Sequence, residues 1–397
     1  MDEIVIVSAV RTPIGRYGGA LGDVQAPDLA ALVLREAVSR IGLEPSRVDE
    51  VVMGHVLVNG EAPNVSRQAV LLADFPIETP AYCVERQCGS GLQAICDGMM
   101  QIQTGNGRIV VAGGVESMSN MEYYVTGARW GLRLNSVPFY DRWERAVETM
   151  STERFGRIPG MIFTAENVAQ QCGITREAQD EFALLSQQRA RAAIKDGKFT
   201  NEIVPVAVPQ KKGAPRIVDR DEHPRPETTL ESLAKLKPVL AGGTVTAGNA
   251  SGMNDGAAAC VLMSERTADE LGLEPLGYLR AWAAGAVHPG YMGLGPVPAV
   301  KRLIEKTGLR LGDIDLIELN EAFAAQALGV LKELGISDFS NVNVNGSGIA
   351  LGHPVGATGV RIMATLLYEM KRRGVRYGLE TMCIGGGQGM AALVERK

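Results

Sequence analysis

The sequence has few of the features that mark membrane-spanning, secreted or zinc-binding proteins. No apolar run is long enough to cross a bilayer, and the first residues lack the basic segment and apolar core of a signal peptide. Only four histidines occur, and none is spaced as a zinc site. The six cysteines include no Cys-x-x-Cys pair, which favours free thiols and a cytoplasmic location.

Neither acidic nor basic residues predominate strongly in the sequence. The formal net charge of −5 gives no reason to expect nucleic acid or an anionic membrane as a partner. A length of 397 residues is enough for two or three domains. A hydrophobic fraction of 46% together with 47 glycines is typical of a globular, turn-rich α/β protein.

Short apolar runs alternate with helical patterns in the first third of the chain. The helix is expected at 27–41, and the strands are expected at 3–10, 49–58, 81–84 and 108–112. This alternation predicts a mostly parallel sheet that is covered by helices on both faces.

The last third repeats this order. Strands are expected at 277–286, 314–319 and 341–344, and helices at 300–306 and 355–374. The match extends to individual residues at a constant offset, with Gly42-Leu43 corresponding to Gly308-Leu309 and Val48-Asp49 to Ile314-Asp315. At almost the same offset, Cys88 corresponds to His353. We interpret this as an internal duplication; the alternative is chance similarity of two βα units.

Two like halves related by a pseudo-twofold axis would bring Cys88 and His353 toward one another. The division predicted here is an N-terminal half at 1–119, an insertion at 120–250 and a C-terminal half at 251–397, with a strand at 257–264 completing the N-terminal core. The insertion is rich in aromatic residues and methionine and contains an expected exposed helix at 175–195. We interpret it as a cap that supplies walls for a long, partly apolar ligand.

Cys88 lies between an apolar strand and a helix whose buried face is marked by Leu92, Ile95, Cys96 and Met99. The unpaired N–H groups and the dipole at a helix N-terminus favour the thiolate, which is the nucleophilic form of cysteine. The alternative is that Cys88 is a small buried hydrophobic residue.

Three other stretches place reactive side chains beside glycine. His353 lies in NGSGIALGHPVGATG, Cys383 ends an apolar strand before three glycines, and Asn320 follows a strand in LNEAF. Each residue alone has a structural alternative, because turns use glycine anyway and a cysteine can belong to the core. Together they occupy strand ends and helix starts, where α/β folds place their sites.

These stretches resemble the signature blocks of the thiolase family. The blocks are QCGSGLQA, NEAFA, GHPVGATG and CIGGGQG, and VAGGVESMS at 111–119 and TVTAGNASG at 244–252 are also similar. The similarity runs in order from about residue 3 to residue 395. The resemblance implies a five-layered αβαβα core of two duplicated halves with an inserted loop domain.

The resemblance also implies roles for individual residues. Cys88 would be the acylated nucleophile and Cys383 the general acid and base. Neutral His353 would donate one hydrogen bond to an oxyanion through its Nε2–H, and Asn320 would hold a water that donates another. The backbone N–H groups of Cys88 and Gly385 would form a second oxyanion hole.

Coenzyme A and acyl-CoA thioesters would be the substrates, with no permanently bound cofactor and no metal. The residues expected to contact them are Ser251, Ala247 and Met161 by the pantetheine arm, Met292 and Phe323 at the acyl end, and Arg225 at the nucleotide phosphates. One departure concerns Gly160 and Ile162, which stand where many short-chain members carry histidine and glycine.

We therefore expect an acetyl-CoA C-acetyltransferase that condenses two acetyl-CoA molecules or cleaves short 3-ketoacyl-CoA. One alternative is a 3-ketoacyl-CoA thiolase of broader chain length in fatty-acid β-oxidation. Ketoacyl synthases and hydroxymethylglutaryl-CoA synthases are disfavoured by LNEAF and by CIGGG with Cys383. An alternative of another class is a non-catalytic acyl-CoA binding protein. A dimer or tetramer is expected, while chain-length preference and physiological direction stay open.

Overall fold

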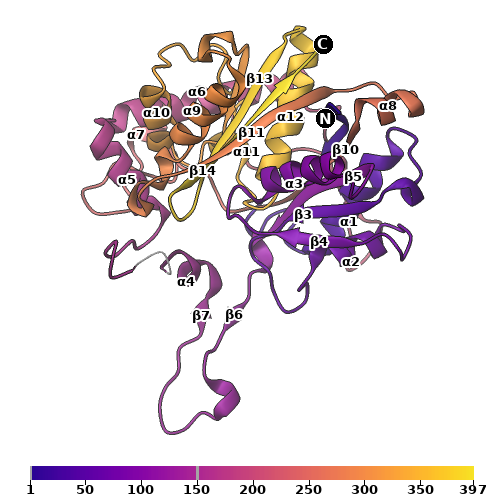
Figure 1. The fold of residues 1–397 in the computed structure, drawn as a ribbon. Helices are drawn as coiled ribbons and strands as arrows, with labels where there is room; N and C mark the ends of the chain where they lie inside the picture. The colour runs from indigo at the N-terminus through magenta and orange to yellow at the C-terminus, as the bar shows by residue number, and fades with distance from the viewer. Residues whose placement is uncertain (1, 149–151) are drawn as a thin grey trace.

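The computed structural model describes residues 2–148 and 152–397 and is built around one twisted sheet (Figure 1). Its strand order is β12-β13-β14-β11-β1-β10-β5-β3-β4, with β2 paired to β10. The strands from the N-terminal side are β1 (Ile4–Arg11), β2 (Gly15–Arg16), β3 (Glu50–Gly54), β4 (Ala81–Val84), β5 (Ile109–Ser117) and β10 (Asn254–Ser264). Those from the C-terminal side are β11 (Gly277–Ala286), β12 (Leu316–Leu319), β13 (Tyr377–Ile384) and β14 (Gln388–Glu395).

The two sides of the sheet have the same construction. The order β3-β5-β10-β1 in one half corresponds to β12-β13-β14-β11 in the other. In each half the first pair is parallel and the other pairs are antiparallel. Strands β1 and β11 pair antiparallel at the centre, with Ile4 opposite Leu279 and Ile6 opposite Gly277, and so join the halves. The predicted duplicated α/β core is therefore confirmed. The mostly parallel sheet expected from the sequence is wrong, because β1, β10, β11 and β14 run antiparallel to their neighbours and only β3–β4, β3–β5 and β12–β13 are parallel pairs.

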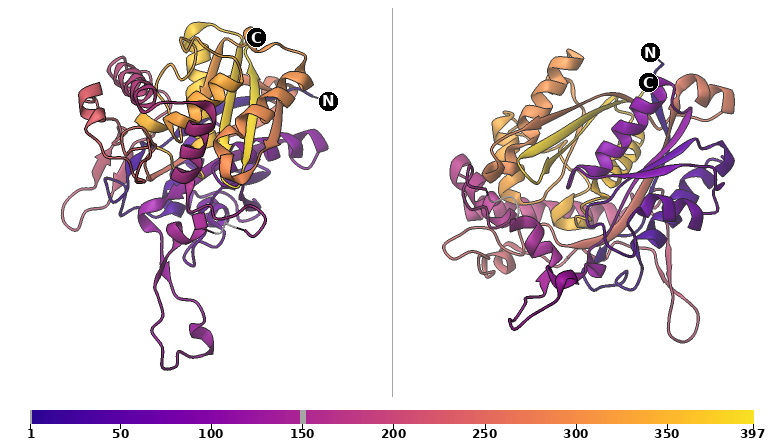
Figure 2. Two further views of the ribbon diagram at one scale, coloured as in Figure 1. Left: turned by 90° about the vertical axis from the view of Figure 1, so that its left-hand side faces the viewer. Right: turned by 60° about the horizontal axis from the view of Figure 1, so that its bottom comes forward.

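Helices form three layers around the two halves of this sheet (Figures 1 and 2). Each layer has its own apolar core with the strands it covers. The outer layer of the N-terminal half holds α1 (Ala26–Ser39) and α2 (Val65–Leu72), the middle layer α3 (Ser90–Thr104) and α12 (Thr358–Arg373), and the outer layer of the C-terminal half α9 (Pro296–Thr307) and α10 (Ala324–Glu333). The short helices α8 (Glu265–Leu271) and α11 (Gly348–Leu351) lie in connections.

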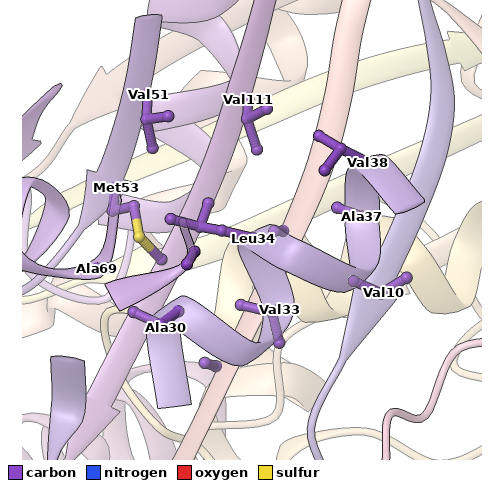
Figure 3. Packing of buried hydrophobic residues seen from close by; sticks show 14 of the residues in the cluster. Val10, Ala30, Val33, Leu34, Ala37, Val38, Val51, Met53, Ala69 and Val111 are labelled. Atoms are coloured by element: carbon purple, nitrogen blue, oxygen red, sulfur yellow. The ribbon is translucent and has the colours of Figure 1, made fainter. Parts of the chain in front are cut away.

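Helix α1 illustrates why these segments fold as they do. A proline lies in its first turn, where the missing N–H costs nothing, and apolar residues recur every three or four positions. Figure 3 shows Leu34 and Val38 of this helix among the strand residues Val10, Val51 and Val111. All five side chains are almost completely buried, so the helix is held by its apolar face.

The segment 120–250 consists of two different parts. A thin ribbon of β6 (Tyr123–Tyr124) and β7 (Tyr140–Asp141) projects away from the body in Figure 1. The remainder is α4 (Arg142–Glu148), α5 (Met161–Cys172), α6 (Arg176–Lys195), β8 (Val206–Val208), β9 (Arg216–Val218) and α7 (Leu230–Ala234). Strand β10 lies between β1 and β5, so it is part of the sheet of the N-terminal half, where the strand at 257–264 was expected. The domain limits 1–119, 120–250 and 251–397 stay a prediction.

Three local predictions need correction. The strand expected at 341–344 is a single bridge between Ile317 and Val342, because Asn343 has a left-handed backbone with φ of 47°. The strand expected at 49–58 ends at Gly54, because the N–H groups of Val56 and Leu57 bond to the Glu116 side chain instead of a neighbouring strand. The expected exposed helix is α6, but one face of it is buried. Among the described residues, no helix has both the length and the apolarity needed to cross a membrane.

Candidate active site

Cys88 is presented by a strained turn between β4 and α3. Gln87 has a positive φ of 46°, which is uncommon for a residue with a side chain and is often found at functional sites. Ser90 stabilises the turn, because its hydroxyl donates to the Gln87 carbonyl at 2.7 Å and accepts the Arg86 N–H at 2.8 Å. This turn leaves the Cys88 side chain half-buried, two residues before the helix begins.

Four glycines allow the starts of α3 and α12 to approach closely. A Cβ atom on Gly114 would lie 2.1 Å from the carbonyl oxygen of Gly356, and one on Gly54 would lie 2.7 Å from it. A Cβ atom on Gly91 would lie 2.9 Å from the same oxygen. Side chains at these positions would force the two helix starts apart. The glycines therefore set how near the Cys88 turn lies to the His353 turn.

His353 lies in the loop between α11 and α12 and is held from three directions. Its backbone N–H donates to Asn254 Oδ1 at 2.9 Å, its ring Nδ1 lies 2.7 Å from Thr358 Oγ1, and its Nε2 lies 3.4 Å from Asn320 Nδ2. Burial, and then the positive charge of Arg361, lower the pKa of His353 to about 3. The imidazole is therefore neutral at physiological pH.

Asn320 and Cys383 come from the ends of the neighbouring strands β12 and β13. The Asn320 N–H donates to the Thr381 carbonyl at 3.0 Å, while its buried Oδ1 has no hydrogen-bond partner among the described residues. A buried amide oxygen of this kind is a natural place for an ordered water. Cys383 is fully buried, and burial together with the nearby Cys88 raises its pKa well above the ordinary value. The raised pKa therefore favours the thiol form of Cys383, which is the form that can donate a proton.

The resting state of Cys88 differs from the sequence-based prediction. Hydrogen bonds from the backbone N–H groups of Gly385 and Cys88 to its sulfur lower its pKa, so the two N–H groups predicted to form an oxyanion hole both lie at this side chain. Burial has the larger, opposite effect, and the net result is that the pKa of Cys88 is raised to about 11. Burial therefore works against the resting thiolate expected from the sequence and favours the thiol form of Cys88.

One cavity of about 480 Å³ is lined by three of the four predicted catalytic side chains, Cys88, His353 and Cys383. The predicted substrate contacts Met161, Ser251, Met292 and Phe323 line the same cavity. Asn320 is not among its lining residues and reaches it only through its contact with His353. Sequence reasoning missed several apolar walls of this cavity, including Trp143, Phe163, Leu240 and Met253. Trp143 belongs to the aromatic-rich stretch of the insertion, but no motif or spacing marks Leu240.

The other two predicted coenzyme contacts lie elsewhere. Arg225 and Ala247 line a second cavity of about 290 Å³, together with His223. The two cavities are neighbours. Ala247 lines the second one, Gly252 lines the catalytic one, and Gly252 also lies against the ring of His223, which lines the second cavity. The structure thus divides the predicted substrate contacts between the catalytic cavity and its neighbour.

The family is identified by the sequence profiles that this chain matches. The profile of the thiolase N-terminal domain matches residues 4–266, and the profile of the thiolase C-terminal domain matches residues 273–396. The chain belongs to the thiolase family. This thiolase is therefore an acyltransferase by family, and the expectation from its signature blocks is confirmed.

Relatives of this thiolase match it over its whole length. It is 49% identical over 401 aligned residues to an acetyl-CoA acetyltransferase of Cupriavidus necator, with 100% of both chains covered. It is 48% identical to an acetyl-CoA acetyltransferase of Pseudomonas aeruginosa, again with 100% of both chains covered.

Solved structures agree with this thiolase in fold. The acetyl-CoA acetyltransferase of Bacillus anthracis superposes with a TM-score of 0.95 at 47% identity, covering 100% of this chain and 99% of that one. Human mitochondrial 3-ketoacyl-CoA thiolase superposes with a TM-score of 0.94 at 42% identity and the same coverage. The five-layered thiolase fold predicted from the sequence is therefore confirmed.

Proposed function

We propose that this thiolase is an acetyl-CoA C-acetyltransferase, which forms acetoacetyl-CoA from two acetyl-CoA molecules and catalyses the reverse thiolysis. The observation that carries the proposal is the convergence of Cys88, His353 and Cys383 on one cavity, with the Gly385 N–H at the Cys88 sulfur. The names of the relatives from C. necator and P. aeruginosa support the same activity.

In the thiolysis direction, the Cys88 thiol passes its proton to the ring of His353 as its sulfur attacks C3 of acetoacetyl-CoA and forms a new S–C bond. The negative charge on the C3 oxygen is stabilised by the backbone N–H groups of Cys88 and Gly385. The C2–C3 bond then breaks, and acetyl-CoA leaves as an enolate whose C2 takes a proton from the Cys383 thiol. The enolate oxygen would lie at His353 and at a water held by Asn320.

The second half-reaction returns the enzyme to its starting state. The Cys383 thiolate removes the proton from the thiol of incoming coenzyme A, whose sulfur attacks the acetyl group on Cys88. The S–C bond to Cys88 breaks, acetyl-CoA is released, and Cys88 regains its proton. The same steps in reverse condense two acetyl-CoA molecules.

We place the acyl and pantetheine parts of the substrate against Met161, Ser251, Met292 and Phe323 in the catalytic cavity. The nucleotide would extend into the neighbouring cavity, where the guanidinium of Arg225 supplies the positive charge that phosphate groups need. Coenzyme A is a substrate in this scheme, and the chemistry asks for no resident cofactor.

A thiolase of broader chain length is the second candidate. Gly160 and Ile162 both line the catalytic cavity, and Ile162 adds apolar surface where many short-chain members carry glycine. The chain is also 42% identical to a 3-ketoacyl-CoA thiolase, which makes a role in fatty-acid β-oxidation the alternative.

Thiolysis of 3-ketoacyl-CoA substrates of increasing length separates these candidates. We expect kcat/KM to be highest for acetoacetyl-CoA and to fall for 3-ketohexanoyl-CoA and 3-ketodecanoyl-CoA. Equal or rising values along the series would favour the broader enzyme. Absence of an acetyl adduct on Cys88 in intact-protein mass spectra would overturn both candidates and leave a non-catalytic acyl-CoA binder.

We also propose that the protein is a cytoplasmic homo-oligomer, with the ribbon of β6 and β7 as one of its contacts. The loop between these two strands carries exposed apolar side chains, with Trp130 86% exposed, Leu134 99% and Phe139 74%. Exposed apolar groups of this size usually mark an interface. Light scattering of a Trp130→Ser/Leu134→Ser/Phe139→Ser variant should show a smaller assembly than the wild type, and an unchanged mass would refute this contact.

A further inference from the structure

The hydroxyl of Thr358, at the start of α12, makes two short contacts. Its Oγ1 lies 2.9 Å from the carbonyl oxygen of Pro354 and 2.7 Å from Nδ1 of His353. Thr358 is completely buried, so no bulk water competes for either contact. The two distances together restrict where the protons can be.

The Pro354 carbonyl can only accept hydrogen bonds, and it already receives the N–H groups of Ala357 and Thr358. An oxygen 2.9 Å from this carbonyl must place a proton between the two atoms, since otherwise two lone pairs would face each other. Thr358 has a single hydroxyl proton, so Oγ1 has only lone pairs left for His353. The short contact to Nδ1 is then a hydrogen bond that Nδ1–H donates.

A neutral imidazole carries one N–H, so a proton on Nδ1 leaves Nε2 with a lone pair. Burial and the Arg361 charge keep His353 neutral, which rules out a second ring proton at rest. The neighbour of Nε2 fits this assignment, because Nδ2 of Asn320 is a donor and lies 3.4 Å away. The ring nitrogen that faces the catalytic side is therefore an acceptor.

We propose that Thr358 is a positioning residue that selects the Nδ1–H tautomer of His353, so that Nε2 meets the substrate-free site as a proton acceptor. This inference rests on the proposed function for its catalytic meaning, but the tautomer is a property of the resting protein. It changes one expectation from the sequence, in which neutral His353 donates through Nε2–H.

The chemical consequence concerns the proton that Cys88 loses. Burial favours the neutral form of both Cys88 and His353, so no thiolate–imidazolium pair is present before substrate reacts. As the S–C3 bond forms, the thiol proton moves from Sγ to Nε2. Burial disfavours the imidazolium, so the negative charge that develops on the substrate has to offset that cost. The imidazolium then carries the Nε2–H that the enolate oxygen needs. When coenzyme A displaces Cys88, this proton returns to the sulfur, which balances the cycle.

The tautomer is measured directly by long-range ¹H–¹⁵N correlation spectra of protein labelled with ¹⁵N-histidine. The chain has four histidines, so the signals of His353 are assigned by their loss in a His353→Gln variant. We expect a protonated Nδ1 and an unprotonated Nε2 for the wild type. A protonated Nε2 in the resting enzyme would overturn the proposal, whether or not any variant folds.

Three variants test what the hydroxyl does. Thr358→Val keeps the shape but removes the hydroxyl, and we expect the proton to move to Nε2 and kcat for thiolysis to fall about 10- to 100-fold with KM changed far less. Thr358→Ser should restore the Nδ1–H tautomer and kcat to within about threefold. Thr365→Val is the matched control, because this buried hydroxyl on the same helix bonds to Glu202 and the Arg361 carbonyl.

The control should lower the melting temperature without changing kcat or the His353 signals. Wild-type kcat in Thr358→Val, or equal losses in the valine and serine variants, would contradict the proposal. If the wild type fails to cleave acetoacetyl-CoA, the proposed function falls while the spectra still decide the tautomer, so the two failures are distinguishable.

Discussion

The turn that carries Cys88 and the turn that carries His353 come from corresponding places in two like halves, yet their surroundings differ. The Cys88 turn follows a partly exposed edge strand, contains the strained Gln87 and leaves the residue Cys88 only half-buried. The His353 turn is buried, and Asn254 and Thr358 bond to its backbone and ring. The N-terminal half leaves Cys88 partly exposed, whereas the C-terminal half fixes the orientation of the His353 ring by hydrogen bonds.

The comparison also shows opposite shifts of the two pKa values with the same outcome. Burial raises the pKa of Cys88 and lowers that of His353, so both groups are neutral in the empty site. The two turns meet because glycines at the junction let backbone touch backbone. The duplication supplies the meeting point, and residues particular to each half decide the chemistry.

The largest effect is expected when the exposed turn loses its sulfur. Cys88→Ala should reduce thiolysis of acetoacetyl-CoA by at least about 10⁴-fold, because no covalent intermediate can form. Intact-protein mass spectrometry after substrate addition should show no acetyl adduct. Retention of wild-type turnover would mean that Cys88 is not the nucleophile.

Replacing the buried sulfur should separate acylation chemistry from proton transfer. Cys383→Ser should lower kcat about 10²- to 10⁴-fold, because a serine hydroxyl is a far weaker acid than a thiol. Labelling of Cys88 by iodoacetamide should continue at a rate close to that of the wild type. If labelling is lost together with turnover, the two cysteines are not independent as proposed.

The junction between the turns can be broken without touching either reactive residue. Gly114→Ala places a methyl group 2.1 Å from the Gly356 carbonyl oxygen, and we expect a loss of about 3 kcal/mol in the free energy of unfolding. Gly312→Ala is the control, because a Cβ there meets nothing within 4 Å. Equal stability of the two variants in urea unfolding would show that the approach of the helices is not tight.

The opposite pKa shifts predict two pH limbs of stability. His353 has a pKa of about 3 when folded and 6.5 as the ordinary value, so the unfolded chain gains its proton first and stability falls as pH drops from 6.5 to 3. His55 and His223 add to this limb, since burial lowers the pKa of each to about 4. Cys88 acts in the other direction, and stability falls as pH rises from 9.0 to about 11.

Urea unfolding across this pH range checks both limbs. We expect His353→Gln to make the acid limb shallower and Cys88→Ala to make the alkaline limb shallower. These are smaller effects than the losses of activity above, because other buried histidines and cysteines share each limb. Limbs that stay parallel to those of the wild type in both variants would contradict the assigned shifts.

Much of the fold was predictable, because apolar periodicity and glycine-rich turns are local signals. The predicted strand at 341–344 failed for a tertiary reason, since Asn343 gives up extended backbone to bond to Leu319 and Glu321 across the loop. The candidate site was predictable where a motif marked it, as for Cys88. It was not predictable for Leu240, whose only signal is its position in the folded chain.

The doubled α/β plan and the candidates for the reactive groups could be read from the linear chain, because periodicity, spacing and residue type are properties of the sequence. The burial that favours the thiol form of Cys88, and the division of the predicted coenzyme contacts between two cavities, follow from the tertiary structure. It also places the Thr358 hydroxyl against the His353 ring, which is the basis for the tautomer proposed above. These properties depend on burial and on neighbours far apart in sequence, and burial is established only when the halves pack together.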